Sequence, residues 1–593
     1  MSIVLFKLPD YRAIGPTLPT ANDPNGNDRS NRDAVMPIDY NEAIEGFEWD
    51  IPDDYDLPSV IESHAAEFGD RVAIRFLSAT GGRNERTYVN LHEDASRFAN
   101  ALAELGIEKG DRVLHLLPRH PDVFSIQIGA LAAGAILVPC SAMLTAEDIT
   151  FRAEDCEATT IVCHDSLTEM VEPVLEDTPI ERVIVLGGAR RPPENRPDSV
   201  TDRADTDSGQ WHSYSELLAD QPTDFDGPPL DSEDYMTINY TSGTTGQPKP
   251  VAHRHRWMYC FEQVNGPYWW GIDEETDLDS ELLWATTGTG WAKWFWSQVG
   301  VALTTGATQL IYDGEFEPER FLTLLEQEEV TRLCAVPTQY RMFAQRDLSA
   351  YDLSLTDALS AGEPLNREPL EAMQEAFELS PRDGYGQTET IGLVLNYPGI
   401  DVQPGSMGRP APGTGTRIVD DAGEEVEDGE IGEIVVPVEC PGLFDGYYER
   451  PDLDEETFSG DLYWTGDLAS RDEDGFYFFE GRADDIIISA GYRIGPFEVE
   501  DALVDHEAVA EAAAVASPQD ERGQVVKAYV VLAEGFEGSE ELTAEIQEYT
   551  KERTAPYKYP RRIEYVAELP KTSSGKIRRI ELREQEERQY GED

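Results

Sequence analysis

The stretch "YMTINYTSGTTGQPKP", Tyr235–Pro250, decides how the chain is expected to fold. Its first part is rich in residues that favour a strand, and its second part is a loop of glycine, serine and threonine. We expect a helix to begin after this loop, near His253. Strand, loop and helix in this order are typical of α/β proteins.

The loop has the composition of a phosphate-binding segment. Its two glycines, Gly243 and Gly246, allow a ligand to approach the main chain closely. Main-chain N–H groups and hydroxyls can coordinate phosphate oxygens, and the hydroxyls here belong to Thr241, Ser242, Thr244 and Thr245. Lys249 adds a positive charge. The spacing differs from GxxxxGK[ST], so a Walker-type loop is excluded, and an isolated loop of this kind is more often an ordinary turn.

Strands and helices alternate on both sides of the stretch. Between about Asp56 and Val200, short apolar runs predict strands ("VAIRF", "RVLHLL", "AILVPC", "TTIVC", "RVIVLGG"), and "LHEDASRFANALAELG" predicts an amphipathic helix that ends at Gly106. The alternation resumes from Met236 to about Asp383. It predicts an α/β fold with mostly parallel sheets.

The pattern of predicted strands and helices changes twice towards the C-terminus. Between Gly405 and Glu480, short β-rich runs separated by turn residues predict a β-rich subdomain. The last hundred residues or so predict a small α+β domain. We therefore expect a flexible extension over residues 1–35, a large domain over 36–483 and a small, mobile domain over 484–593.

The charge is strongly acidic throughout the chain. Asp and Glu number 116 against 47 Lys and Arg, which gives a formal net charge of -69, and only nine of the basic residues are lysine. Such a surface disfavours nucleic acid and anionic membranes as partners. Acidic residues that are spread along the whole chain, together with few lysines, predict a protein adapted to high salt, where screening by ions suppresses the repulsion between its negative charges.

Cysteine usage and hydropathy point to the cytoplasm. The six cysteines form no CxxC pair and no zinc-like cluster, so we expect reduced, buried thiols. The uncharged stretch Val123–Ala146 is long enough to span a bilayer, but its glycines and Pro139 favour a buried helix, a glycine stop and a core strand. No membrane span and no secretory signal peptide are therefore predicted.

Five further stretches accompany the opening loop: "SAGEPLN" (360–366), "DGYGQTET" (383–390), "YWTGDL" (463–468), "GRADDIIISAGYRIGP" (481–496) and "PKTSSGKIRR" (570–579). Together they resemble the adenylate-forming superfamily of acyl-CoA synthetases, luciferases and peptide-synthetase adenylation domains, over nearly the whole chain after about residue 40. The segments "GYRIGPFEVE" and "APYKYPR" are most similar to those of AMP-forming medium-chain acyl-CoA synthetases.

The resemblance implies a reaction in two steps. A carboxylic acid attacks the α-phosphate of ATP to give acyl-adenylate and pyrophosphate, and the thiol of coenzyme A then displaces AMP. Positioning and charge neutralisation carry such chemistry. By resemblance, Thr388 binds the α-phosphate, Glu389 holds Mg²⁺ and Lys576 assists the first step as a catalytic residue.

The resemblance also assigns the nucleotide. The opening loop and Lys249 would hold the β- and γ-phosphates, Asp467 would take the ribose hydroxyls, and Arg482 would assist there. The adenine slot and its surroundings would be formed by Gly362, Glu363, Pro364, Asp383, Gly384, Tyr385 and Gln387. Each of three residues also has a plain structural interpretation when it is considered alone. Glu389 fits a solvent-exposed acid, Asp467 fits an aspartate in a turn, and Lys576 fits part of a basic C-terminal segment.

For the second step, the resemblance implies a rotation of the small domain about Asp484. Coenzyme A would then contact Ala490, Gly491, Arg493 and Lys551. Many relatives carry serine where this chain has Ala490, which weakens that assignment unless only main-chain groups are used there. Asp484 and Lys551 also fit simple surface charges.

The segment "TTGTGWAKWFW", Thr286–Trp296, matches the acyl-binding stretch of the superfamily. We expect Trp291 to line an apolar pocket, whereas Trp294 and Trp296 fit core packing equally well. Acetate-specific relatives resemble "WWQTE", and Gly386 stands where their second tryptophan closes the pocket. An open pocket predicts short-to-medium or branched acids. The position of Lys293 stays open between solvent and a polar acyl tail.

The leading hypothesis is an AMP-forming acyl-CoA ligase of small carboxylic acids. Two alternatives stay open at this point: adenylation for transfer to the thiol of a separate carrier protein, and a nucleotide-binding sensor without catalysis. The joint presence of Lys576, Glu389, Asp467 and Thr388 argues against the sensor.

Overall fold

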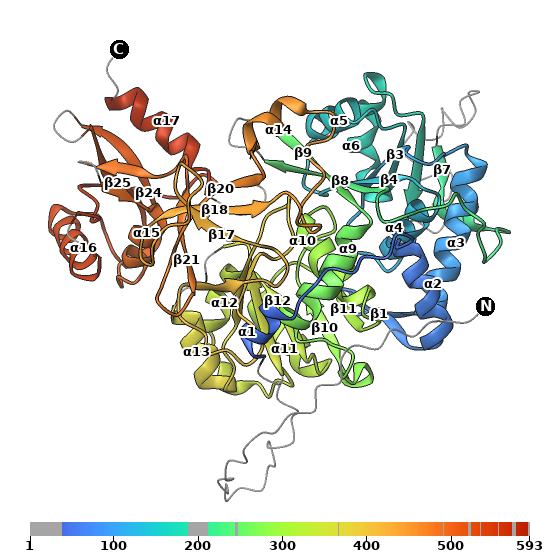
Figure 1. The fold of residues 1–593 in the computed structure, drawn as a ribbon, viewed down its shortest axis with the longest axis horizontal. Helices are drawn as coiled ribbons and strands as arrows, with labels where there is room; N and C mark the ends of the chain where they lie inside the picture. Colours follow the sequence, from blue (N-terminus) through green and yellow to red (C-terminus); the bar gives the residue numbers. More distant parts are fainter. Residues whose placement is uncertain are drawn as a thin grey trace, which may run out of the picture. The chain divides into compact units, whose positions relative to one another are not determined.

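The computed structural model (Figure 1) describes residues 38–187, 211–242, 247–363, 365, 367–489, 492–519, 523–533, 535–554, 557–571 and 577–590. In this part of the chain, strands form two large sheets and one small sheet, with helices packed against them. The predicted mixed α/β fold is confirmed.

The first large sheet contains the opening stretch. Its strands follow the order β7 (Trp211–Ser213), β6 (Arg182–Leu186), β5 (Thr160–His164), β3 (Arg112–Leu116), β4 (Ile136–Cys140), β8 (Tyr235–Ser242) and β9 (Pro248–Arg254). Neighbouring strands are parallel except β8 and β9, which pair antiparallel with Thr241 opposite Lys249. The helix expected near His253 begins three residues later, as α9 (Arg256–Cys260), but strand β9 between the loop and this helix was not expected, because the loop closes a β-hairpin.

The second large sheet has a parallel half and an antiparallel half. Its order is β17 (Arg417–Val419), β18 (Gly432–Pro437), β20 (Leu462–Arg471), β21 (Tyr477–Arg482), β16 (Ser406–Pro410), β15 (Val394–Leu395), β14 (Arg382–Tyr385), β13 (Asp357–Ala361), β12 (Arg332–Ala335), β10 (Leu282–Ala285), β11 (Thr308–Tyr312), β1 (Val72–Leu77) and β2 (Arg83–Thr87), with β19 (Phe458–Ser459) beside β20. Strands β14 to β1 pair in parallel, and β17 to β15 pair antiparallel. The antiparallel half is the predicted β-rich region.

Helices cover the large sheets. They include α2 (Leu57–Phe68), α3 (Tyr88–Glu104), α4 (Val123–Ala132), α5 (Ala146–Asp155), α10 (Ala292–Trp294), α11 (Pro318–Gln327), α12 (Pro337–Ala344), α13 (Arg367–Phe377) and α14 (Pro451–Thr457), with π-helices η5 (Phe261–Trp270) and η7 (Phe295–Leu303). Helix α3 begins where Thr87 and Asn90 cap each other reciprocally. Helix α4 is buried over residues 123–131, as its uncharged sequence predicts. Within the described residues, no helix is long and apolar enough to cross a membrane.

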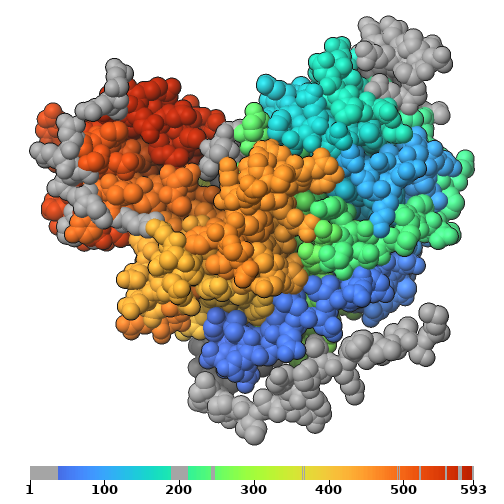
Figure 2. Space-filling model, turned by 45° about the horizontal axis from the view of Figure 1, so that its top comes forward, coloured from blue at the N-terminus to red at the C-terminus, as the bar shows by residue number. Residues whose placement is uncertain are grey.

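The N-terminal part of the described chain runs along the second sheet. Figure 2 shows its first residues, in dark blue, beside the yellow and orange segments. Ile38 N donates to Pro398 O at 3.3 Å, and Trp49 Nε1 donates to Gly413 O at 2.8 Å. Tyr40 meets Tyr397 edge to face, with ring centroids 5.3 Å apart. These contacts tie the start of the described chain to the region around β15 and β16.

The C-terminal region forms the predicted α+β unit. Strands β23 (Tyr492–Ile494), β22 (Ile487–Ser489), β25 (Gly523–Leu532) and β24 (Val509–Gln519) are neighbours in this order, and β26 (Arg562–Tyr565) joins β25. Helices α15 (Pro496–Val504), α16 (Glu540–Arg553) and α17 (Arg579–Tyr590) belong to this unit. The expected extension over residues 1–35 lies outside the described residues.

Candidate functional site

The carboxyl ends of neighbouring parallel strands carry the site segments. Strand β10 ends just before Thr286–Trp296, β13 ends at Ala361 before Gly362, and β14 ends at Tyr385 before Gly386. Ligands of open α/β sheets bind at this edge. Segments that lie about a hundred residues apart in the sequence thus meet along one edge.

Asp467 lies at the centre of a network of three donors. The Tyr385 hydroxyl donates to Oδ2 at 2.7 Å and Gln387 Nε2 donates to the same atom at 2.5 Å. Arg482 Nη1 donates to Oδ1 at 3.0 Å. The carboxylate is 5% exposed, and its charge raises the pKa of Arg482. Asp467 on β20 and Arg482 on β21 are paired residues of the antiparallel half, so the network joins that half to strand β14.

Asp383, two residues before Tyr385 on β14, presents an unpaired acceptor. Its side chain is 5% exposed, and its Oδ1 atom has no hydrogen-bond partner among the residues that the structure describes. Burial raises the pKa of its carboxyl group well above the ordinary value. A buried polar atom without a partner is costly, so this atom is suited to receive a donor from a ligand.

Gly362 and Glu363 shape the end of β13. Gly362 has φ +107°, and an added Cβ would meet no atom within 4 Å, so the residue borders open space. The Glu363 carboxylate accepts from Thr338 Oγ1 and Arg341 Nη2, each at 3.1 Å. Lys293 donates to the carbonyl oxygen of Ala361 at 2.8 Å. The ammonium group of Lys293 therefore binds the main chain at this slot.

Glu389 and Lys249 meet through Tyr447. The Tyr447 hydroxyl donates to Glu389 Oε1 at 3.1 Å, and Lys249 Nζ lies 5.2 Å from the centre of the Tyr447 ring. Glu389 is 8% exposed, and burial raises its pKa, which Tyr447 and Lys249 partly oppose. The hairpin of the opening stretch is thus brought to the acidic end of "DGYGQTE". Tyr447 was not predicted from the sequence, which offers no motif for it.

His253 was also missed, and it holds Thr388. Its Nε2 atom lies 2.7 Å from the Thr388 carbonyl oxygen, and its ring stacks on Trp257 with centroids 3.6 Å apart. Burial lowers the pKa of His253 to about 3, so the ring is neutral at physiological pH and donates through Nε2. His253 on β9 therefore fixes the main chain that carries Thr388.

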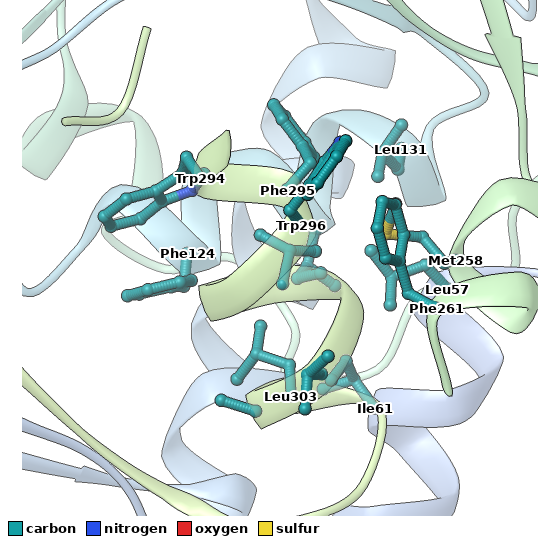
Figure 3. Packing of buried hydrophobic residues seen from close by; sticks show 14 of the residues in the cluster. Leu57, Ile61, Phe124, Leu131, Met258, Phe261, Trp294, Phe295, Trp296 and Leu303 are labelled. Carbon is teal, nitrogen blue, oxygen red and sulfur yellow. The ribbon is translucent and has the colours of Figure 1, made fainter. Parts of the chain in front are cut away.

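The tryptophans of the acyl-binding stretch take different positions (Figure 3). Trp294 packs in the core against Phe124, with ring centroids 4.8 Å apart, and its Nε1 donates to Gln127 Oε1 at 3.1 Å. Trp296 lies instead against Gly386: a Cβ added there would be 2.3 Å from Trp296 Cη2 and 2.4 Å from Ile391 O. The Trp296 ring and the Ile391 carbonyl oxygen therefore fill the place that a side chain at Gly386 would take. Trp291 is partly exposed at the start of α10.

The predicted coenzyme A contacts are described only in part. Arg493 pairs with Ile488 in the hairpin of β22 and β23, and Lys551 on α16 forms an ion pair with Glu548 at 2.8 Å. This pairing raises the pKa of Lys551. Several predicted site residues lie outside the described residues: Gly243, Thr244, Thr245, Gly246, Pro364, Ala490, Gly491 and Lys576; the side chains of Ser242 and Arg493 are likewise not described.

Two family models match most of the chain. The model described as AMP-binding enzyme covers residues 61–448, and the AMP-binding enzyme C-terminal domain covers residues 498–576. The chain belongs to the AMP-binding enzyme family. The matched ranges fall on either side of residues 483 and 484, where we place the domain boundary, and the boundary itself stays a prediction.

Relatives of this AMP-binding enzyme are named acyl-CoA ligases and synthetases. A protein of Bacillus subtilis named "Uncharacterized acyl--CoA ligase YtcI" is 40% identical over 90% of this chain and 97% of its own length. The mouse mitochondrial acyl-coenzyme A synthetase ACSM3 is 39% identical over 83% of this chain and 82% of its own length.

Solved structures agree with this family. The anthranilate CoA ligase AuaEII in complex with anthranoyl-AMP is 28% identical, with a TM-score of 0.80 over 91% of this chain and 98% of that one. A benzoate CoA ligase from Burkholderia xenovorans is 27% identical, with a TM-score of 0.76 over 89% of this chain and 100% of that one. The predictions of the superfamily, of the fold and of an AMP-forming acid–thiol ligase acting on a small acid, ATP and coenzyme A are confirmed.

Proposed function

We propose that this AMP-binding enzyme activates a short-to-medium-chain or branched carboxylic acid as its adenylate and then transfers the acyl group to coenzyme A. One observation carries the proposal. Four consecutive residues after β14 connect the proposed sites for the acid, the ribose and the phosphates. Gly386 borders Trp296 at the acyl site, and Gln387 binds Asp467 at the ribose site. At the phosphate site, Thr388 is held by His253 and Glu389 by Tyr447. A reaction between an acid and the α-phosphate of ATP needs such a junction.

In the first step, an oxygen of the substrate carboxylate attacks the α-phosphorus, and the bond to the bridging oxygen of pyrophosphate breaks. Asp467 accepts hydrogen bonds from the ribose hydroxyls, a role supported by its buried, already oriented carboxylate. The unpaired Oδ1 of Asp383 accepts from the amino group of adenine. Thr388 binds the α-phosphate, and Lys249 with the loop of residues 243–246 binds the outgoing pyrophosphate.

The residues present fit one Mg²⁺ ion that is shared with the phosphates. The described residues contain no group of three or more His, Cys, Asp or Glu side chains that would form a protein cage for a metal. Mg²⁺ is commonly held by one or two carboxylates together with substrate phosphates, and Glu389 is the buried carboxylate available here. When bound, the ion would neutralise phosphate charge, and its field would favour the ionised form of Glu389.

The small domain supplies the remaining residues. Lys576 contacts the acid and the α-phosphate in the first step, where its charge offsets the repulsion between the two anions. Rotation about Asp484 then exchanges Lys576 for the segment around Ala490, Gly491 and Arg493. The coenzyme A thiolate attacks the acyl carbon, and AMP leaves. Lys551 is our proposal for the nucleotide end of coenzyme A.

The proposed substrate class rests on the pair of Gly386 and Trp296. Gly386 has no side chain, and the Trp296 ring occupies the place that one would take, so this ring supplies the apolar boundary there. An apolar wall of this kind favours acyl chains longer than acetate, since each buried methylene contributes about 0.8 kcal/mol. We place the limit of chain length at Trp296.

The enzyme is proposed to work in a reducing, salt-rich cytoplasm. All six cysteines are buried and free, which suits a compartment without disulfide formation. The net charge of -69 suits high ionic strength.

A panel of acids tests the substrate class. Purified enzyme with ATP, Mg²⁺ and coenzyme A at high salt is given straight-chain acids from acetate upward, together with branched and aromatic acids, and AMP release is measured. We expect the highest kcat/KM with medium or branched chains. Acetate as the best substrate would contradict the pocket argument, although the ligase chemistry would stand.

A further inference from the structure

The hinge turn carries a contact that the two-step reaction does not explain. Residues 483–485 form a turn after β21, in which Asp485 N donates to Arg482 O at 3.0 Å. Arg583 Nη1 donates to the carbonyl oxygen of Asp484 at 2.8 Å, and its Nη2 lies 3.6 Å from Asp484 Oδ2. The same guanidinium forms an ion pair with Asp485. One arginine thus binds the main chain and both carboxylates of this turn.

Arg583 lies on a helix that is fixed independently of the turn. Helix α17, red in Figure 1, carries Glu586, whose carboxylate is fully buried and accepts from Lys527 Nζ at 2.5 Å and from the Tyr529 hydroxyl at 2.6 Å. At its first turn, Arg579 Nε donates to Glu500 Oε1 of α15 at 3.1 Å. Because these contacts anchor the helix on both sides of Arg583, its guanidinium is presented from a rigid support.

The same helix follows the loop that contains Lys576. Ile577 bridges to Lys571 immediately after that loop, and α17 begins at Arg579. The body that carries the lysine of the first step therefore also binds the hinge turn. A rotation changes the main-chain dihedral angles of the hinge, so it changes the direction of the Asp484 carbonyl. The contact with Arg583 is then made differently in the two orientations of the small domain.

We propose that Arg583 is a positioning residue, which binds the hinge turn at Asp484 and Asp485 and thereby sets the balance between the adenylating and thioester-forming orientations of the small domain. The inference rests on the proposed two-step reaction and on Asp484 as its hinge. A contact that differs between two orientations shifts their equilibrium by the difference in its free energy. One hydrogen bond to a charged group corresponds to a change of about tenfold to a hundredfold in that equilibrium.

The two half-reactions are measured separately in the full chain to test this inference. Acid-dependent exchange between ATP and pyrophosphate reports the first step, and a single turnover of enzyme-bound adenylate with coenzyme A reports the second. In Arg583→Ala, we expect the ratio of the two rates to change at least tenfold. Arg583→Lys, which keeps the charge and one donor for the carbonyl, should recover part of that change.

Two further variants separate positioning from stability. Arg588 lies on the same helix with a side chain that is 74% exposed. Its Nε donates to the Glu584 carbonyl oxygen of that helix at 3.0 Å, and no contact with the hinge turn is found among the described residues, so Arg588→Ala should leave the ratio unchanged. Asp485→Asn removes one of the negative charges that pair with Arg583, and combining it with Arg583→Ala should add little to the effect of Arg583→Ala alone. Thermal unfolding of each variant confirms that the fold is retained.

The results that support the inference differ from those that contradict the proposed function. A changed ratio with partial rescue by lysine supports the inference. Equal losses in both half-reactions, or no change in Arg583→Ala, would overturn it. Failure of the unaltered enzyme to catalyse acid-dependent exchange would instead contradict the proposed function on which the inference depends.

Discussion

The indole of Trp296 is expected to set the limit of acyl chain length. It lies where a side chain at Gly386 would point, with Cη2 only 2.3 Å from the position of an added Cβ. In Trp296→Leu, the smaller side chain lengthens the pocket. Each additional methylene that becomes buried is worth about 0.8 kcal/mol, which is about fourfold in kcat/KM. An acid with three more carbons should therefore improve about sixtyfold relative to the acid that the unaltered enzyme prefers.

The assay is kcat/KM for a series of straight-chain acids, measured as AMP release. The change also costs stability, because truncating a buried tryptophan to alanine costs about 3–5 kcal/mol and leucine retains part of that packing. Trp294→Leu is the matched control. Trp294 is fully buried and stacks on Phe124, whereas the atoms nearest to a Cβ at Gly386 belong to Trp296 and Ile391, so the loss of Trp294 should lower stability without moving the preferred chain length. An unchanged profile in Trp296→Leu, or the same shift in Trp294→Leu, would refute the reasoning.

Three further predictions concern the nucleotide, pH and salt. Asp467→Asn removes the charge that binds Arg482, and we expect KM for ATP to rise about tenfold to a hundredfold in steady-state kinetics, whereas an unchanged KM would exclude Asp467 from the ribose site. Burial raises the pKa of Glu262 from 4.5 to about 7, so its ionisation destabilises the folded state as the pH rises through this window. This side chain keeps some contact with solvent, so we expect only part of the full effect. Glu262→Gln should raise the free energy of unfolding, measured with a chemical denaturant, by about 1–2 kcal/mol at pH ~8 and should not change it at pH ~4. Equal increases at both pH values would contradict the raised pKa of Glu262. The net charge of -69 predicts a melting temperature that rises with KCl between about 0.1 M and about 1 M, over which the Debye length falls from about 10 Å to about 3 Å, and a melting temperature that falls would contradict it.

Local patterns predicted most of the elements. The amphipathic run Leu91–Gly106 predicts a helix, and helix α3 spans Tyr88–Glu104, with an N-terminal cap at Thr87 that the sequence analysis does not name. The uncharged stretch from Val123 resolves into helix α4 and strand β4, because Gly134 ends the helix between them. Directly after the glycine loop, the sequence analysis misses strand β9 and places the helix that begins at Arg256 three residues too early. Two strands around a short glycine-containing loop also fit a hairpin, and pairing with β8 decides between the two readings.

The contacts that complete the site depend on packing between distant segments. Tyr447 beside Glu389 and Trp296 beside Gly386 join residues that no short motif connects. The same holds for Lys293, whose contact with Ala361 is neither of the two positions considered from the sequence. Motifs thus indicate which residues carry the chemistry, and the tertiary structure determines which neighbours orient them.

The central claim is tested most directly by the products of a single reaction. ATP, Mg²⁺, coenzyme A and a medium-chain acid are incubated with the enzyme at high salt, and AMP, ADP and acyl-CoA are quantified together. We expect equal amounts of AMP and acyl-CoA, both dependent on the acid and on coenzyme A. Formation of ADP, or the absence of acid-dependent AMP across the whole panel of acids, would contradict it.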